Sequence, residues 1–207
     1  MAAFVQPSGK SSVLDVGAGV GAVSLCLAAH HPEVQITGLE VQEEIINLAE
    51  KNAVNNDVQG RVKFIRGDLS TPPKEIPLNS FDHVVTNPPY FEKYSKSIDA
   101  SKSKARHVQD LGLEGWIEAC LKFVKPRGFF TLILRADQID KIITSISAKA
   151  GALKIMPLWP AIGKSAKLIL VSARKGVKTK AEFLPGYILH EKTGKKIFLN
   201  CFITKVC

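Results

Sequence analysis

Several features that would indicate other classes of protein are missing from this sequence. The four cysteines have no C-x-x-C spacing and no histidine partners at the spacing of a zinc site, so we expect no bound metal. No apolar run approaches the roughly 18 residues of a membrane span. The start, Met1-Ala2-Ala3-Phe4, lacks the basic region of a signal peptide. These absences predict a cytoplasmic protein that does not associate with membranes.

The length and the order of apolar segments predict a single α/β domain over residues 1–207. Strand-like and helix-like segments alternate along the chain, without internal repeats. In the second half we expect strands at 128–134, 153–158 and 166–174 and a helix at 137–150. Such alternation is typical of a doubly wound, mainly parallel sheet with helices on both faces. Ligands bind such sheets at the carboxyl ends of the strands.

The most informative motif is Asn87-Pro88-Pro89-Tyr90, which follows the apolar run Val84-Val85-Thr86. The run predicts a buried strand, and the two prolines end it. They also restrict the backbone, so that the Asn87 amide and the Pro88 carbonyl can act as two aligned acceptors beside the Tyr90 ring. Two acceptors and a ring suit a planar group with an NH2, whose lone pair stays free to attack. The motif therefore indicates methylation of an exocyclic or amide nitrogen, with a strand-ending turn as the structural alternative.

A glycine loop lies upstream, in the stretch from Val13 to Gly21. An apolar strand here runs into Gly17, Gly19 and Gly21 and then into a helix, an arrangement that lets a ligand approach the backbone. Gly17-x-Gly19-x-x-Ala22 also fits the dinucleotide fingerprint, so a nicotinamide cofactor and S-adenosylmethionine are both compatible with it. Asp15 favours S-adenosylmethionine, because a carboxylate would repel a pyrophosphate but attract an ammonium and a sulfonium. A loop acid that binds the glycine amides is the structural alternative.

Two further acids follow predicted strands. Glu40 lies 19 residues after Gly21 (40 − 21), close to the spacing expected of an acid that binds ribose hydroxyls. It could also cap the helix that follows. Asp68 ends the next strand, where an adenine amine would need an acceptor, and its alternative role is to organise the turn at Leu69-Ser70-Thr71-Pro72.

Together these residues resemble the class I S-adenosylmethionine-dependent methyltransferases of the small-domain type, and most closely the tRNA(Val) adenine-N6-methyltransferases. The resemblance covers nearly the whole chain. It is carried by the glycine loop, Glu40, Gly67-Asp68, the stretch 81–91, Ala105-Arg106-His107 and the tail 184–191.

The resemblance implies a fold, a cofactor and a set of site residues. The fold is a Rossmann-like sheet of seven strands with an antiparallel strand among the last. The cofactor is S-adenosylmethionine, held by Asp15, Gly17, Ala18, Gly19, Glu40, Asp68 and Leu69. The target amine is held by Asn87, Pro88 and Tyr90. In the family a further segment precedes the stretch that Ala2-Ala3-Phe4-Val5 resembles, so we expect a more open cofactor cleft here and weak cofactor binding.

Positive charge gathers beside the predicted amine site. The net charge is +9, and the segment 93–107 contains five cations against one acid, Asp99. The tail after Arg174 is also basic. Cations beside an amine pocket would neutralise the phosphates of a nucleic acid, although a solvated charge run is the alternative. The candidate substrate contacts are Lys102, Lys104, Arg106, His107 and Lys167.

The sequence thus predicts an enzyme that transfers a methyl group from S-adenosylmethionine to the N6 amine of an adenine in RNA, with tRNA as the expected RNA. Three alternatives stay open: glutamine N5-methylation of a protein such as a release factor, a nicotinamide-dependent oxidoreductase, and an RNA-binding module without activity. The oligomeric state is not predicted.

Overall fold

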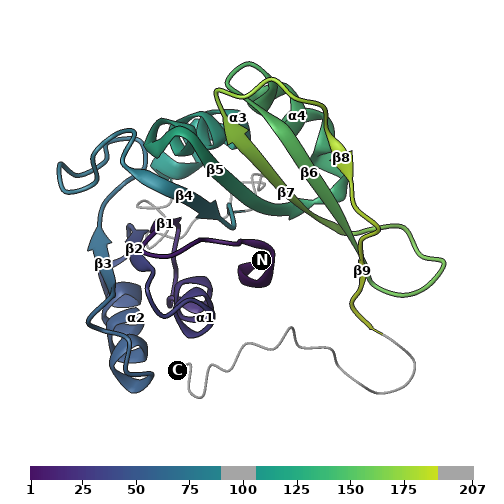
Figure 1. Cartoon of the computed structure of the whole chain (residues 1–207). Helices are drawn as coiled ribbons and strands as arrows, with labels where there is room; N and C mark the ends of the chain where they lie inside the picture. The colour runs from purple at the N-terminus through teal and green to yellow at the C-terminus, as the bar shows by residue number, and fades with distance from the viewer. Residues whose placement is uncertain (90–105, 191–207) are drawn as a thin grey trace.

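The structure is a computed structural model that describes residues 1–89 and 106–190, apart from the side chains of residues 106–110 (Figure 1). A short 3-10 turn, Ala2–Phe4, precedes the sheet, and another, Ala136–Gln138, precedes the last helix. The strands and helices are β1 (Ser12–Val16), α1 (Ala22–His30), β2 (Gln35–Glu40), α2 (Glu43–Asn55), β3 (Val62–Arg66), β4 (Phe81–Thr86), α3 (Arg106–Phe123), β5 (Val124–Arg135), α4 (Ile139–Ser147), β6 (Ala150–Trp159), β7 (Leu168–Lys175), β8 (Glu182–Phe183) and β9 (Tyr187–Ile188).

The strands form one mixed sheet in the order β3-β2-β1-β4-β5-β7-β6. β1 to β5 pair in parallel, and β7 lies between β5 and β6, antiparallel to both. The two-residue strands β8 and β9 pair with the outer side of β6. The expected α/β class, the mainly parallel sheet and the late antiparallel strand are therefore confirmed.

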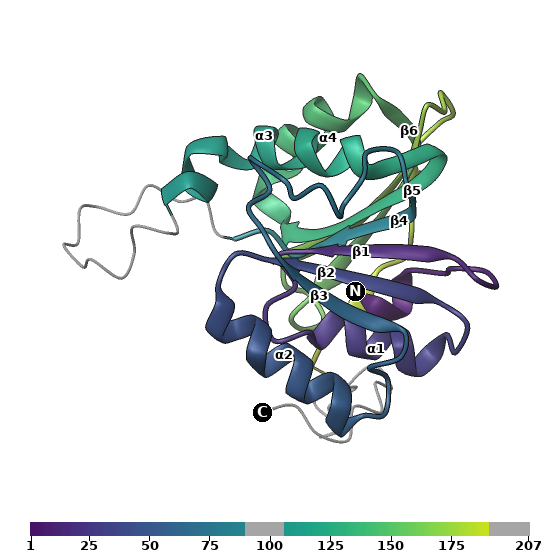
Figure 2. The ribbon, with the colours of Figure 1, turned by 90° about the vertical axis from the view of Figure 1, so that its left-hand side faces the viewer.

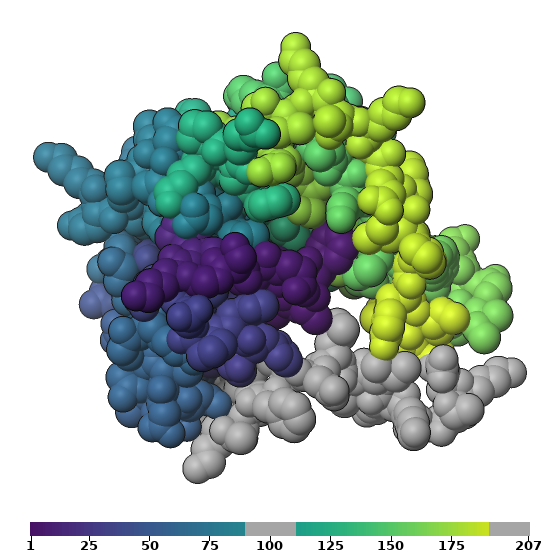
Figure 3. All heavy atoms as spheres, in the orientation of Figure 1, coloured from purple at the N-terminus to yellow at the C-terminus, as the bar shows by residue number. Residues whose placement is uncertain are grey.

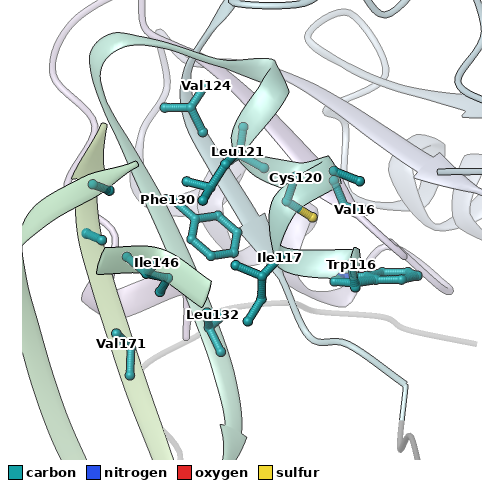
Figure 4. Close-up of a cluster of buried hydrophobic side chains, with 14 of the residues drawn as sticks. Val16, Trp116, Ile117, Cys120, Leu121, Val124, Phe130, Leu132, Ile146 and Val171 are labelled. Carbon is teal, nitrogen blue, oxygen red and sulfur yellow. The ribbon is translucent and has the colours of Figure 1, made fainter. Parts of the chain in front are cut away.

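Helices cover both faces of the sheet, with α1 and α2 on one face and α3 and α4 on the other (Figure 2). The alternation of side chains along β1 explains the two layers, because successive residues of a strand point to opposite faces. Leu14 and Val16 belong to the core beneath α3 and α4, whereas Val13 belongs to the core beneath α1 and α2. Figure 4 shows the first core, in which Ile117 of α3 lies against Phe130 and Leu132 of β5, while Trp116 lies on the side away from β7.

The later elements differ from expectation at their ends. β5 begins at Val124 rather than at 128, and its pairing with β4 shifts register between Phe81 and His83. Pro126 cannot donate a hydrogen bond and Arg127 has φ of 66°, so the strand is irregular there. The predicted helix 137–150 is a 3-10 turn followed by α4, and Ala150 already belongs to β6.

No helix in residues 1–89 and 106–190 is long and apolar enough to cross a membrane. The same residues contain no cluster of three or more acidic, histidine or cysteine side chains that could hold a metal ion.

Candidate functional site

A cavity of about 240 Å³ opens at the carboxyl ends of β1, β2 and β4. Four residues expected from the sequence line it: Gly17, Glu40, Leu69 and Asn87. Sequence reasoning missed other parts of the wall, namely Val41 and Gln42, which directly follow Glu40, and Trp116 of α3. The three parallel strands thus bring the glycine loop, the second acid and the Asn-Pro-Pro corner to one place.

The glycine loop has a backbone that side chains would disturb. Gly17, Gly19 and Gly21 have φ of 70°, 54° and 85°, in the left-handed region that favours glycine. A Cβ on Gly21 would also lie 2.7 Å from Cζ of Phe64. The backbone N–H groups of Gly17 and Ala18 both donate to the carbonyl of Leu39. The loop is therefore held against the end of β2, next to Glu40.

The Glu40 carboxylate faces this loop and is 8% exposed. Its Oε2 accepts a hydrogen bond from the Gly19 N–H at 3.1 Å, and its Oε1 accepts from the N–H groups of Val41 and Gln42 at 2.9 and 3.0 Å. A carboxylate offers about four acceptor sites, so three are occupied and one is available to a ligand in the cavity. Both roles expected of Glu40, hydroxyl binding and organisation of the start of α2, are compatible with this position.

Asp15 lies on the other face of β1 from the cavity-lining Val16. It is 2% exposed, and its Oδ2 accepts a hydrogen bond from Ser24 Oγ at 2.7 Å, in the first turn of α1. Burial raises the pKa of Asp15 to about 6, and the nearby Glu40 adds to this effect, whereas hydrogen bonds from Ser24 oppose it. Asp15 thus supports the helix that begins after the glycine loop. Contact between Asp15 and a cofactor stays a prediction.

Asp68 occupies a turn. Its Oδ1 accepts hydrogen bonds from both the backbone N–H and the hydroxyl of Ser70, each at 2.7 Å, which is the alternative that its sequence context offered. Asp68 is not among the residues that line the cavity, whereas its neighbours Gly67 and Leu69 are. Its role as an acceptor for adenine stays a prediction.

The Asn-Pro-Pro corner follows β4 as expected. Asn87 is exposed and lines the cavity with Pro89, while Pro88 is buried. Tyr90 lies outside the described residues. The corner is therefore open to a substrate at Asn87 and anchored in the protein at Pro88.

A buried hydrogen-bond network fixes the residue before Asn87. The hydroxyl of Thr86 donates to the carbonyl of Val16 at 2.9 Å and accepts from Trp116 Nε1 at 3.0 Å. Trp116 is 4% exposed, and its ring lies beside Gly17, where a Cβ would be 3.5 Å away. The network therefore connects the end of β1, the end of β4 and α3 around the cavity.

The expected basic contacts are described only in part. Lys102 and Lys104 lie outside the described residues, and Arg106 and His107 begin α3 with side chains that the structure does not describe. Lys167 precedes β7 at the same edge of the sheet as Asn87. Its N–H donates to the carbonyl of Leu158, and its carbonyl accepts from the Ala136 N–H.

A family model and curated relatives show what the chain is similar to. Residues 1–111 match the methyltransferase small domain. A tRNA1(Val) (adenine(37)-N6)-methyltransferase from Shewanella baltica is 27% identical over 172 residues, which cover 82% of this chain and 72% of that protein. A protein of the same name from Shewanella sp. (strain MR-4) is 30% identical over 160 residues, covering 77% and 67%.

Solved structures show the same fold. The crystal structure of an Agrobacterium tumefaciens protein described as a predicted O-methyltransferase is 25% identical, with a TM-score of 0.77, and the match covers 94% of this chain and 88% of that one. TrmN from Thermus thermophilus, at 17% identity and a TM-score of 0.58, shares the fold over 81% of this chain and 44% of that one.

The raised pKa of Asp15 predicts a pH-dependent cost to stability. The folded protein binds a proton at Asp15 up to about pH 6, whereas the unfolded chain releases it near pH 4. The free energy of unfolding should therefore fall as pH rises from 4 to 6, by about 3 kcal/mol from this group. Asp15→Asn cannot ionise and should lack this fall, as measured by urea unfolding at pH 4, 5, 6 and 7.

Ser24→Ala is the matched control, because it removes a hydrogen bond that favours the ionised form. It should raise the pKa of Asp15 further, so the fall in stability should still begin near pH 4 but become larger and extend to higher pH. Parallel pH profiles for the wild type and Asp15→Asn would show that Asp15 titrates normally in the folded protein.

Proposed function

This chain belongs to the methyltransferase small domain family and is an S-adenosylmethionine-dependent methyltransferase, and we propose that its acceptor is the N6 amine of an adenine in RNA, with tRNA as the expected RNA. The observation that carries the proposal is the position of Asn87. Its exposed amide lies on the wall of the cavity that the glycine loop and Glu40 also line. A cytoplasmic location follows if tRNA is the substrate.

The residues around the cavity fit the cofactor. At Gly19 no other atom lies within 4 Å of the place where a Cβ would be, so the loop backbone is open there, and Glu40 retains an acceptor site that suits a ribose hydroxyl. Val41 and Leu69 supply apolar walls for an adenine ring. Glu40, which lines the cavity, favours a positively charged ligand there, and the buried Asp15 on the other face of β1 adds negative charge nearby.

The protein's contribution to the reaction is orientation. S-adenosylmethionine, held by the glycine loop and Glu40, would supply an electrophilic methyl group: the bond to the amine nitrogen would form as the carbon–sulfur bond breaks, leaving a neutral thioether, and the methylated amine would release its proton to water. The Asn87 side-chain oxygen and the Pro88 carbonyl accept the two amine hydrogens, so that the nitrogen lone pair points into the cavity. Holding the reacting groups in this way supplies much of the rate enhancement, and no general base is required.

The choice of RNA rests on charge and on the relatives. Net charge is +9, and two of the relatives carry names that specify adenine-N6 methylation of a tRNA. An adenine in a folded RNA must leave its stack to enter the cavity. The deciding assay incubates the protein with labelled S-adenosylmethionine and either unmodified total tRNA or release factor. Label in N6-methyladenine supports the proposal, and label in glutamine would replace it.

Asn87→Ala should separate chemistry from cofactor binding. The substitution removes one acceptor for the amine and leaves the glycine loop and Glu40 unchanged. Loss of an interaction aligned for the transition state should lower kcat by about 10²-fold or more, while the Kd for S-adenosylmethionine, measured by calorimetry, changes little. Asn87→Asp should restore activity only in part. Near-full turnover by Asn87→Ala would refute the assignment of the amine site.

Thr86 should affect turnover through the position of Asn87. Thr86→Val keeps the shape of the side chain but loses both hydrogen bonds, to Val16 and from Trp116. Because small displacements at a reacting centre are costly, we expect kcat to fall about tenfold or more with a smaller change in cofactor Kd. Thr86→Ser retains the hydroxyl and should recover most of the rate. A loss of rate in Thr86→Ser that Thr86→Val does not share would mean that the methyl group, and not the network, matters.

A further inference from the structure

A second pocket lies at the same edge of the sheet, between the β6–β7 loop and the tail after β8. It has a volume of about 530 Å³ and is lined by Trp159, by loop residues 161–164 and by tail residues 185–188. Ile162 of the loop is 80% exposed. In Figures 1 and 3 the loop and the tail form the right-hand side of the molecule. We call this site the hairpin–tail pocket.

The backbone of the tail fixes the shape of this pocket. The Leu189 N–H donates to the carbonyl of Trp159 at 2.7 Å, and the His190 N–H donates to the carbonyl of Pro160 at 3.1 Å. Gly186 has φ of 82°, and a Cβ there would overlap the six-membered ring of Trp159. The tail therefore lies directly against the indole and holds its orientation, so the aromatic wall is formed before any ligand binds.

The chemistry of the pocket is aromatic and basic. Trp159 and Tyr187 are partly exposed, and Lys164 lines the same space. The loop from residue 160 to residue 167 contains two lysines and no acid. Asp137, which follows β5, is paired with Arg135. Aromatic rings beside cations bind single-stranded nucleic acid, because every base can stack on a ring while the cations neutralise the backbone.

The sheet order places the pocket a short distance from Asn87. β6 runs parallel to β4 and β5, because β7 is antiparallel to both β5 and β6. Trp159, the last residue of β6, and Asn87, which follows β4, therefore lie at the same edge. Three strand spacings, from β4 through β5 and β7 to β6, amount to about 14–15 Å. Lys167 lies between them, bridging the ends of β5 and β6 through its backbone. The separation corresponds to a few nucleotides.

We propose that the hairpin–tail pocket binds an unstacked nucleotide of the RNA strand that also carries the target adenine. The base stacks on Trp159 and Tyr187, and Lys164 and Lys167 contact the phosphates between the pocket and Asn87. This inference rests on the proposed function for its ligand class. It adds a substrate-binding site outside the methyl-transfer cavity, which would select the sequence or loop geometry around the adenine.

The test measures binding of a fluorescein-labelled, unmodified tRNA transcript to the full chain by anisotropy at several salt concentrations. Tyr187→Ala should weaken binding about 5- to 150-fold, the range for loss of one base stack, whereas Tyr187→Phe keeps the ring and should bind nearly as the wild type does. We choose Tyr187 and not Trp159 for substitution, because the Trp159 ring packs against Gly186 and its replacement would disturb the tail.

Lys164→Glu/Lys167→Glu tests the charge component. Loss of each phosphate contact should reduce the slope of log Kd against log salt by about 0.7. The matched control is Lys10→Glu/Lys122→Glu, which makes the same change of charge at the opposite, amino edge of the sheet, where both lysines are exposed. The control should retain most of the affinity. Cofactor Kd should be unchanged in all of these variants.

The outcomes separate the two proposals. Equal RNA affinity for the wild type and Tyr187→Ala, equal losses in the two lysine pairs, or no RNA binding by the wild type would each overturn the pocket assignment. RNA binding that depends on Tyr187 and Lys164 but yields no methylated adenine would support the pocket and refute the proposed acceptor. Binding of release factor that is lost in Tyr187→Ala, with no effect on RNA, would assign the pocket to a protein and overturn the inference.

Discussion

The hydroxyl of Thr86 joins three parts of the chain that are distant in sequence and that together make the cavity. It donates to the end of β1 and accepts from α3, while its own backbone leads into Asn87. Because the site is buried, each of these hydrogen bonds is strengthened by the low local dielectric, and loss of either partner is costly. The start of the glycine loop and the Asn-Pro-Pro corner therefore keep a constant separation, which transfer between two bound molecules requires.

Close packing against glycines provides the second constraint. The Phe64 ring lies where a Cβ of Gly21 or of Gly38 would be, so β3 packs directly against the loop and against β2. Side chains in native interiors are packed about as closely as molecules in a crystal. Here the Phe64 ring packs in this way against a loop that has three residues in the left-handed conformation. The loop conformation is thereby supported from below by an aromatic side chain and from the side by the hydrogen bonds of Leu39 and Glu40.

The sequence predicted those parts of the fold and of the site whose signal is local. An apolar strand that ends in glycines or in two prolines identifies its own carboxyl end, so Gly17 and Asn87 could be placed at one edge, and the spacing from Gly21 added Glu40 to them. Trp116 could not be placed, because an isolated tryptophan in an amphipathic helix does not indicate which strand ends it will meet. Asp68 shows where local sequence signals are insufficient. An aspartate at this position is expected both in a turn and in a ligand site, so the sequence alone does not distinguish the two roles. The start of β5 was misplaced because Pro126 and Gly128 signal a loop, yet the sheet tolerates them at an irregular pairing with β4.

The antiparallel insertion of β7 leaves β6, a ten-residue strand, at the border of the sheet. A long border strand is a template for pairing with other chains and hence for aggregation. Here the outer side of β6 is paired with β8 and β9. The tail adds hydrogen bonds from the Leu184 N–H to the carbonyl of Ile155 and from the Leu189 N–H to the carbonyl of Trp159. The segment that shields β6 from self-association is thus the same segment that shapes the hairpin–tail pocket. Substrate preference can diversify there only through substitutions that preserve this pairing, so solubility limits how the specificity of the enzyme can evolve.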